Sequence, residues 1–133
     1  MEPPRDSVES ELKSVVVPEL RTNGFTGSFP HFRRPDPLGV DLLTFQFDRN
    51  GGGFVIEIAR GPATGFVTHW GKEIPAERLT AWDLHPDERH RIKPRAGSGT
   101  ESWFRYDNGD VRTCSMLVLA ALPTAEAWWA SKK

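Results

Sequence analysis

The residues best suited to metal or acid–base chemistry carry imidazole or carboxylate groups and lie in one stretch: His69, Asp83, His85, Asp87, Glu88 and His90. Imidazole nitrogens and carboxylate oxygens bind zinc and other divalent metals, so Asp83, His85 and His90 are the candidate metal ligands. With His69 they predict, as one alternative, a small hydrolase whose histidine and aspartate side chains converge. The spacing of His85 and His90, however, matches neither one face of a helix nor a zinc finger. We therefore prefer to interpret this stretch as a solvated charged loop, and we predict no cofactor.

Hydroxyl and thiol groups that could act as nucleophiles occur at Thr68, Ser98, Ser102 and Cys114. Neither serine stands in the Gly-x-Ser-x-Gly pattern that exposes a nucleophile at a strand–helix turn. Cys114 falls on the apolar stripe of a predicted C-terminal helix, where a thiol is typically an inert core residue. The glycine run 51–53 separates two predicted strands, so it indicates a turn and not a phosphate-binding loop. The sequence thus carries no catalytic signature and favours a protein that is not an enzyme.

Arginines and aromatic residues form the best functional signal in the chain. Six arginines lie on predicted strands or at their ends: Arg33, Arg34, Arg60, Arg91, Arg95 and Arg105. The guanidinium group offers a planar fork of donors and stacks on aromatic rings, so a converging set would bind an anion or a partner. The candidate binding residues are Arg33, Arg34, Arg60, His69, Trp70, Arg91 and Trp103. The alternative is that these arginines are scattered on the surface and paired with the 18 acidic residues.

Composition narrows the class of protein. A chain of 133 residues predicts one domain, 1–133, and its polar, proline-rich start, residues 1–5, is expected to be disordered. The formal net charge of −1 argues against a general nucleic-acid or membrane-surface binder and leaves local nucleic-acid binding through the arginines as a weaker alternative. No apolar stretch suggests a membrane span or signal peptide. The single cysteine cannot form an intrachain disulfide, and we expect a cytoplasmic protein.

A β-hairpin stands at the centre of the predicted fold. Its strands are Val40–Asp48 and Phe54–Arg60, and the turn between them, residues 49–53, contains Asn50-Gly51. Apolar residues alternate with others along both strands, which is the pattern of a half-buried strand. The residues on the buried face are Leu43, Phe45, Phe47, Phe54, Ile56 and Ile58. The same pattern predicts an edge strand at Ser28–Arg34 and short strands at Phe66–Trp70, Arg91–Lys93 and Ser102–Tyr106, with a helical turn at Pro75–Leu79.

Helices are predicted at both ends of the chain. The first should begin with Asp6 as N-cap and Glu9 completing a capping box, and should stop at Asn23-Gly24. Pro18 should kink this helix or divide it into two segments. The last helix should begin after Asp110, with Pro123 again kinking or dividing it, and should end near Trp128 and Trp129, one ring packed inward and the other partly exposed. The expected fold class is α+β: an antiparallel sheet of four or five strands with both helices packed on one face.

The order of several short motifs resembles the DUF4304 family of small, mostly bacterial domains of unassigned function. The motifs are Leu20-Arg-Thr-Asn-Gly24-Phe25, Phe32-Arg33-Arg34, Phe45-Gln46, Arg91-Ile92, Trp103-Phe104 and Trp128-Trp129. The resemblance extends over nearly the whole chain. It implies helices packed against an antiparallel sheet, and it brings no catalytic residues.

The function that these observations favour is a non-enzymatic binding or protein-interaction module. Its contact surface would be the irregular segment 61–95 with neighbouring strand residues, because loops on a rigid scaffold commonly carry function. The expected partner is a protein or a small anionic ligand, and we expect a monomer or homodimer.

Overall fold

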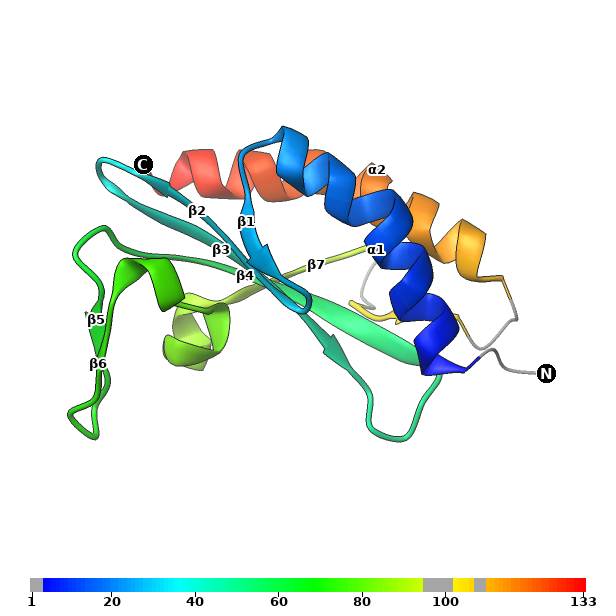
Figure 1. Ribbon diagram of the computed structural model, residues 1–133, viewed down its shortest axis with the longest axis horizontal. Helices are drawn as coiled ribbons and strands as arrows, with labels where there is room; N and C mark the ends of the chain where they lie inside the picture. Colours follow the sequence, from blue (N-terminus) through cyan, green and yellow to red (C-terminus); the bar gives the residue numbers. More distant parts are fainter. Residues whose placement is uncertain (1–3, 95–101, 107–109) are drawn as a thin grey trace.

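A computed structural model describes residues 4–94, 102–106 and 110–133 of the chain (Figure 1). The predictions made for residues 1–3, Arg95, the loop 96–100 with Ser98, and the turn 107–109 lie outside this described part. Two helices, α1 (Arg5–Thr22) and α2 (Val111–Ser131), accompany one large antiparallel sheet. The predicted α+β class is therefore confirmed.

The described strands of the large sheet are β1 (Thr26–Ser28), β2 (His31–Asp36), β3 (Gly39–Phe47), β4 (Gly53–Pro62), β7 (His90–Ile92) and β8 (Phe104–Arg105). Their order is β1-β2-β3-β4-β7, and β8 pairs with the first residues of β4. The central hairpin has the predicted register, since Leu43 lies opposite Ile58 and Phe45 opposite Ile56. Five strands are thus hydrogen-bonded side by side in one row, as expected, and β8 adds a sixth strand to the sheet.

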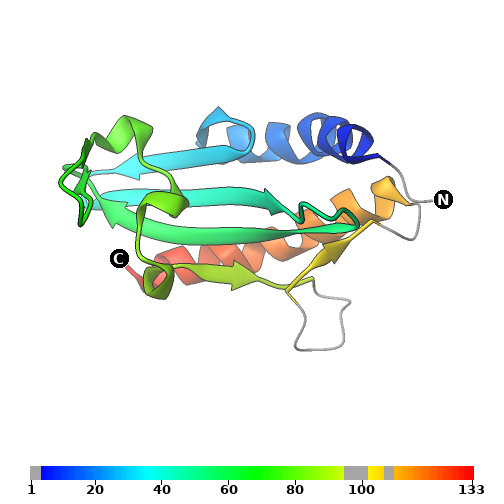
Figure 2. The same cartoon turned by 90° about the horizontal axis from the view of Figure 1, so that it is seen from below.

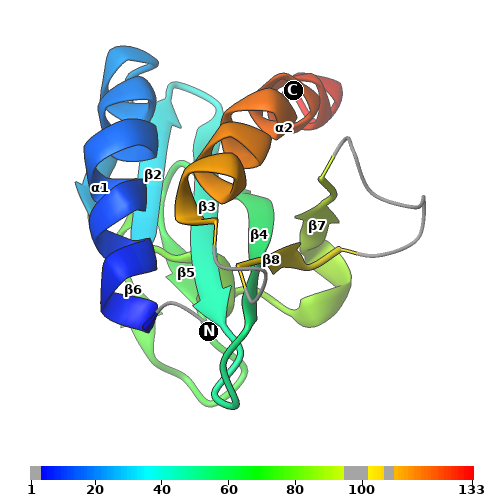
Figure 3. The same cartoon turned by 90° about the vertical axis from the view of Figure 1, so that its right-hand side faces the viewer.

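Both helices cover the same face of the sheet, as predicted (Figures 1 and 3). The core between the layers joins the inward stripe of α1, the phenylalanines and isoleucines of the central strands, and the inward side of α2. Representative members are Leu12 and Val16 of α1, Phe45, Phe54 and Ile58 of the central strands, and Cys114, Val118 and Trp129 of α2. Burying an aliphatic or aromatic side chain of this size contributes about 1.5–3 kcal/mol, so this layer supplies most of the hydrophobic stabilisation.

The opposite face of the sheet is covered near one end by the chain that follows β4. This segment contains a small hairpin, β5 (Phe66–Val67) and β6 (Glu73–Ile74), and three 3-10 turns, η1 (Ala76–Arg78), η2 (Ala81–Asp83) and η3 (Pro86–Glu88). Figure 2 shows these turns in front of the sheet and the helices behind it. A second apolar cluster joins Leu42 and Ala59 of the sheet to Leu79, Ala81 and Leu84. We call residues 63–89 the cover segment.

The structure corrects the predicted start of the first helix and excludes one of the two alternatives predicted for each helix proline. Asp6 is not the N-cap, because α1 begins at Arg5 and the extended Pro4 precedes it, with the Pro4 carbonyl accepting from Ser7 N at 3.0 Å. Residue Arg5 is thus helical and pairs with Glu9. Neither Pro18 nor Pro123 divides its helix into separate segments. A proline in a helix interior costs about 3 kcal/mol, which the burial of several stripe residues outweighs.

Two strand predictions also change. The single edge strand expected at Ser28–Arg34 is instead a hairpin, β1 and β2, whose turn holds Phe29 and Pro30. A proline has no N–H to donate to a ladder, which favours the turn position. The strand expected at Phe66–Trp70 is shorter and pairs with β6 and not with the large sheet, because the chain turns at Gly71, whose φ is +88°.

Candidate functional site

Arg34 and Arg60, two of the predicted binding residues, meet on the helix-covered face of the sheet. The strand register places Asp41 of β3 directly between Arg34 of β2 and Arg60 of β4. The fully buried Asp41 carboxylate accepts from Arg34 Nη2 at 2.9 Å and from Arg60 Nη1 at 2.7 Å. One buried carboxylate therefore bridges two guanidinium groups.

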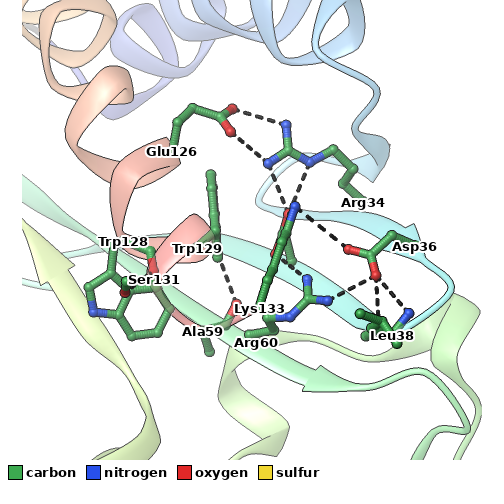
Figure 4. Close-up of polar contacts among 12 residues, drawn as sticks. Arg34, Asp36, Leu38, Ala59, Arg60, Glu126, Trp128, Trp129, Ser131 and Lys133 are labelled. Carbon is green, nitrogen blue, oxygen red and sulfur yellow. Dashed lines mark hydrogen bonds and ion pairs between the residues drawn. The ribbon is translucent and has the colours of Figure 1, made fainter.

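Three further residues extend this pair of bridges into an ion-pair network (Figure 4). Arg34 donates to both carboxylate oxygens of Glu126 on α2, at 2.7 and 3.0 Å. Arg60 donates to Asp36 at 2.9 Å, and Lys133 Nζ lies 3.8 Å from the other Asp36 oxygen. The network ties the turn between β2 and β3 to the end of α2. Because its carboxylates already occupy the two guanidinium groups, an anionic ligand or a nucleic-acid phosphate would have to compete with them.

Asp36 gives the network a dependence on pH. The hydrogen bond from Arg60, helped by the Leu38 N–H, holds the pKa of Asp36 well below its ordinary value of 3.8. A carboxylate whose pKa is lower in the folded state stabilises the fold above its unfolded pKa and loses that contribution as pH falls. We expect the midpoint temperature of thermal unfolding, followed by circular dichroism, to fall as the pH is lowered from about 5 to about 2. The fall should be smaller for Asp36→Asn than for the wild type. Equal drops in the two proteins would show that this pair does not set the acid sensitivity.

The remaining predicted arginines and Trp103 lie elsewhere. Arg33 points to the other face of the sheet, where its Nε donates to the Leu79 carbonyl at 2.9 Å and fastens the cover segment to β2. Arg91 lies on that same face, with Nε 3.6 Å from a carboxylate oxygen of the buried Glu57. Trp103 contacts Arg105 next to β8, which pairs with the opposite end of β4 from Arg60. The predicted set is thus distributed over both faces and both ends of the sheet.

The histidine and aspartate candidates separate into two places. His90 lies on the helix-covered side, its ring stacked on Trp128 with centroids 5.6 Å apart. Asp83 and His85 lie in the cover segment, where Asp83 accepts from Thr80 N at 2.8 Å and His85 Nδ1 accepts from Asp87 N at 3.1 Å. Within residues 4–94, 102–106 and 110–133, no group of three or more histidine, cysteine, aspartate or glutamate side chains is placed to hold a metal ion.

A groove of about 570 Å³ lies between the end of α2 and the start of β7. Its lining residues are mostly charged: Arg60, Asp87, Glu88, Arg89, His90, Trp128 and Lys132. Partial burial, and then the charges of Lys93 and Lys132, lower the pKa of His90. Both signs of charge occur in the groove, so its composition selects no single class of ligand.

A second hollow brings two predicted residues, His69 and Trp70, together with aromatic rings that the sequence did not single out. This aromatic pocket has a volume of about 280 Å³, and its lining residues are Phe66, Thr68, His69, Trp70, Trp82, Asp83, Leu84, His85, Pro86 and Arg89. Trp70 is 64% exposed and Trp82 is 44% exposed. Because large aromatic side chains are usually buried in a monomer, two exposed indoles at one hollow mark a candidate contact site.

Short-range hydrogen bonds hold the walls of the aromatic pocket. In the β5–β6 hairpin, Thr68 accepts from the Lys72 and Gly71 backbone N–H groups, which presents His69 and Trp70 at the tip. On the other wall, Thr80 and Asp83 form a capping box around η2, the turn that carries Trp82. The Trp82 ring also meets the His31 ring of β2 edge to face, with centroids 4.9 Å apart. The pocket is therefore built on the rigid sheet through His31 and Arg33.

Cys114 behaves as a core residue, as expected from its place on the apolar stripe of α2. It is buried, and this burial, with a smaller effect of Asp110, raises the pKa of its thiol to about 12. The thiolate is the reactive form of cysteine, so we expect an aromatic disulfide reagent to modify the folded protein very slowly at neutral pH and the urea-unfolded protein rapidly. Rapid modification under native conditions would show that the thiol is accessible, contrary to this packing.

Neither helix of the described chain combines the length and apolar character that crossing a lipid bilayer requires.

A family model described as "Domain of unknown function (DUF4304)" matches residues 16–132. The chain belongs to the DUF4304 family. The match extends from the middle of α1 through the sheet and the cover segment to the end of α2, and it confirms the resemblance predicted from the short motifs. No curated protein and no solved structure matches the chain. The function of this DUF4304 domain must therefore be inferred from its own surface.

Proposed function

We propose that this DUF4304 domain is a non-enzymatic protein-interaction module of the bacterial cytoplasm, which binds its partner through the aromatic pocket. The observation that carries the proposal is the pair of exposed indoles, Trp70 and Trp82, lining one hollow. Tryptophan is strongly enriched among the residues that supply most of the energy of protein interfaces, especially where a partner side chain fills a pocket. The buried thiol of Cys114 is compatible with a reducing compartment.

The other large exposed apolar side chains of the described chain bring no second pair of indoles to one hollow. Leu38 lies in the turn between β2 and β3, and Met116 lies on the outer side of α2. Val67 is also exposed, but it belongs to the same hairpin as Trp70 and extends the apolar surface beside the pocket. Scattered apolar residues are normal on a protein surface, whereas a concave group with two indoles can anchor a partner.

A hydrolase remains the alternative function, because His69, Asp83 and His85 line the aromatic pocket. Two observations weigh against it. The Asp83 carboxylate accepts from Thr80, and His85 Nδ1 accepts from the backbone of Asp87, so both side chains serve their own turns. His90, the fourth member of the predicted set, lines the other groove.

Selection from a library of random peptides displayed on phage tests the proposal. Peptides enriched on the wild-type domain should bind Trp82→Ala and Trp70→Ala about thirtyfold more weakly, since removing a central interface anchor costs at least about 2 kcal/mol. Met116→Ala is the matched control, because it removes an exposed apolar side chain from the opposite side of the sheet. Far-UV circular dichroism verifies that each variant is folded.

Two outcomes would contradict the proposed function. In the first, the selection enriches no peptide above a bare surface. In the second, the enriched peptides bind the two tryptophan variants as well as they bind the wild type.

A further inference from the structure

The β5–β6 hairpin has two outer edges, and its own hydrogen bonds show which backbone groups lie on them (Figure 1). The Thr68 N–H donates to the Lys72 carbonyl at 2.9 Å, so these two residues form a hydrogen-bonded pair. Hydrogen-bonded and non-hydrogen-bonded pairs alternate along an antiparallel ladder. The next pair, Val67 and Glu73, is therefore non-hydrogen-bonded, and the N–H and C=O groups of both residues point away from the hairpin.

These outward groups have no partner within residues 4–94, 102–106 and 110–133, because no hydrogen bond there joins the backbone of Val67 or Glu73 to another strand or loop. In the edge strand β1, by contrast, the Gly27 carbonyl accepts from Arg21 Nη2 at 2.6 Å. An edge strand without such protection can pair with a strand of another chain. The hairpin thus offers two edges at which a further strand can pair.

The edge of β5 suits pairing better than the edge of β6. Charged side chains on an edge strand oppose its pairing with another chain. The chain enters β6 through Lys72 and Glu73, and both are exposed. Strand β5 consists of Phe66 and Val67, two residue types that favour strands, and Val67 is 60% exposed. Nothing charged lies in β5 itself, so its edge is the open one.

The aromatic pocket lies beside this edge of β5. Residues i and i+2 of a strand share one face, and Phe66 and Thr68 both line the pocket. Ile74 of β6 lies directly opposite Phe66 but does not line the pocket, so the pocket extends from β5 in the direction away from β6. A strand paired with β5 therefore runs along the pocket, with every second side chain on the pocket face.

We infer that an extended segment of the partner protein pairs with the outer edge of β5 and adds a third strand to the β5–β6 sheet. This inference rests on the proposed function and adds the conformation of the bound segment. One partner residue exchanges two hydrogen bonds with the N–H and C=O of Val67, and the residues before and after it direct their side chains to the pocket face. The partner segment therefore carries apolar or aromatic residues at two positions separated by one.

A pair of proline variants tests the inference on the domain. Proline removes a backbone N–H and is tolerated on an edge strand where that group faces outward, so Val67→Pro and Glu73→Pro should both fold. Val67→Pro should weaken the binding of an enriched library peptide at least about tenfold, because it removes a donor to the added strand. Glu73→Pro on the other edge is the matched control, and Val67→Ala controls for the lost side chain. Both controls should bind within about threefold of the wild type.

Methylation of the backbone nitrogens of the peptide, one at a time, tests the same pairing without any change in the domain. The methyl group should weaken binding at least about tenfold at the residue that donates to the Val67 carbonyl. At the residues before and after it the loss should stay within about threefold, since their N–H groups point away from β5. Equal losses at consecutive positions, or no loss at any position, would contradict strand pairing whether or not a proline variant folds.

The outcomes separate this inference from the proposed function. If the enriched peptides depend on Trp70 and Trp82 but tolerate Val67→Pro and every backbone methyl group, the interaction module stands and the added strand is wrong. If the library yields no peptide above a bare surface, both proposals fail.

Discussion

Asp41→Asn is expected to lower the free energy of unfolding by about 3–5 kcal/mol, because it leaves two guanidinium groups without the carboxylate that bridges them. Asp41 is fully buried, and Arg60 is almost as well covered. Asparagine has nearly the same shape, so the loss would come from charge and not from a cavity. It can accept one of the two hydrogen bonds, but it cannot balance either positive charge.

Urea unfolding of the wild type and Asp41→Asn measures this loss directly, provided that both transitions have the same slope. Asp87→Asn is the control, because this aspartate is 90% exposed and pairs with the exposed His85, and the change should stay within about 0.5 kcal/mol. A loss below about 1 kcal/mol for Asp41→Asn would mean that Glu126 and Asp36 are sufficient to hold Arg34 and Arg60 in place, contrary to a bridging role for Asp41.

Trp129→Ala is expected to lower the free energy of unfolding by about 3–5 kcal/mol, the range for removing a large buried aromatic side chain. The indole is buried between α2 and the sheet and donates to the Ala59 carbonyl at 3.0 Å (Figure 4). Its ring lies 5.1 Å from the Phe25 ring, and the Arg34 guanidinium lies over it. The substitution would leave a cavity and an unpaired buried carbonyl in one step.

The neighbouring residue supplies the matched control. Trp128 is partly exposed, with its ring against His90 and Lys132, so Trp128→Ala should lower the free energy of unfolding by about 1 kcal/mol or less. Equal losses for the two alanine variants in urea unfolding would contradict the assignment of Trp129 as the inward ring.

The central hairpin and the two helices were predictable because their side chains repeat with a period. Leu43, Phe45 and Phe47 alternate along one strand, and Leu12, Val16 and Leu20 recur at helical spacing, so burial follows from sequence position. The first residue of each helix and the effect of the helix prolines were less predictable. Tertiary packing decides whether the hydrogen bond that a proline removes breaks a helix.

Part of the ion-pair network could have been predicted from the sequence. Once Leu43 is placed opposite Ile58 in the hairpin, the same register places Asp41 opposite Arg60. The contribution of Arg34 was harder to predict, because it depends on the register between β2 and β3, and β2 extends to Asp36, beyond the end expected at Arg34.

One side of the aromatic pocket carries the predicted binding residues His69 and Trp70, and the other side carries Trp82, which was not predicted to bind. Trp70 stood out as an aromatic residue of a predicted short strand, within the set of arginines and aromatic residues, whereas Trp82 lies in 3-10 turns that have no period to detect. The pattern Thr80-x-x-Asp83 was the available signal, since it caps the turn that carries Trp82. Bringing Trp70 and Trp82 together depends on how the cover segment folds back over β2, which no local pattern encodes.

We propose above all that a protein partner binds at the aromatic pocket. NMR spectra of the labelled domain, recorded while an enriched library peptide is added, test it most directly. We predict that the indole signals of Trp70 and Trp82 and the backbone signals of residues 66–89 shift, while the Trp129 indole does not. Shifts confined to His90, Trp128 and Lys132, with Trp70 and Trp82 unchanged, would place the binding site in the other groove and contradict the claim.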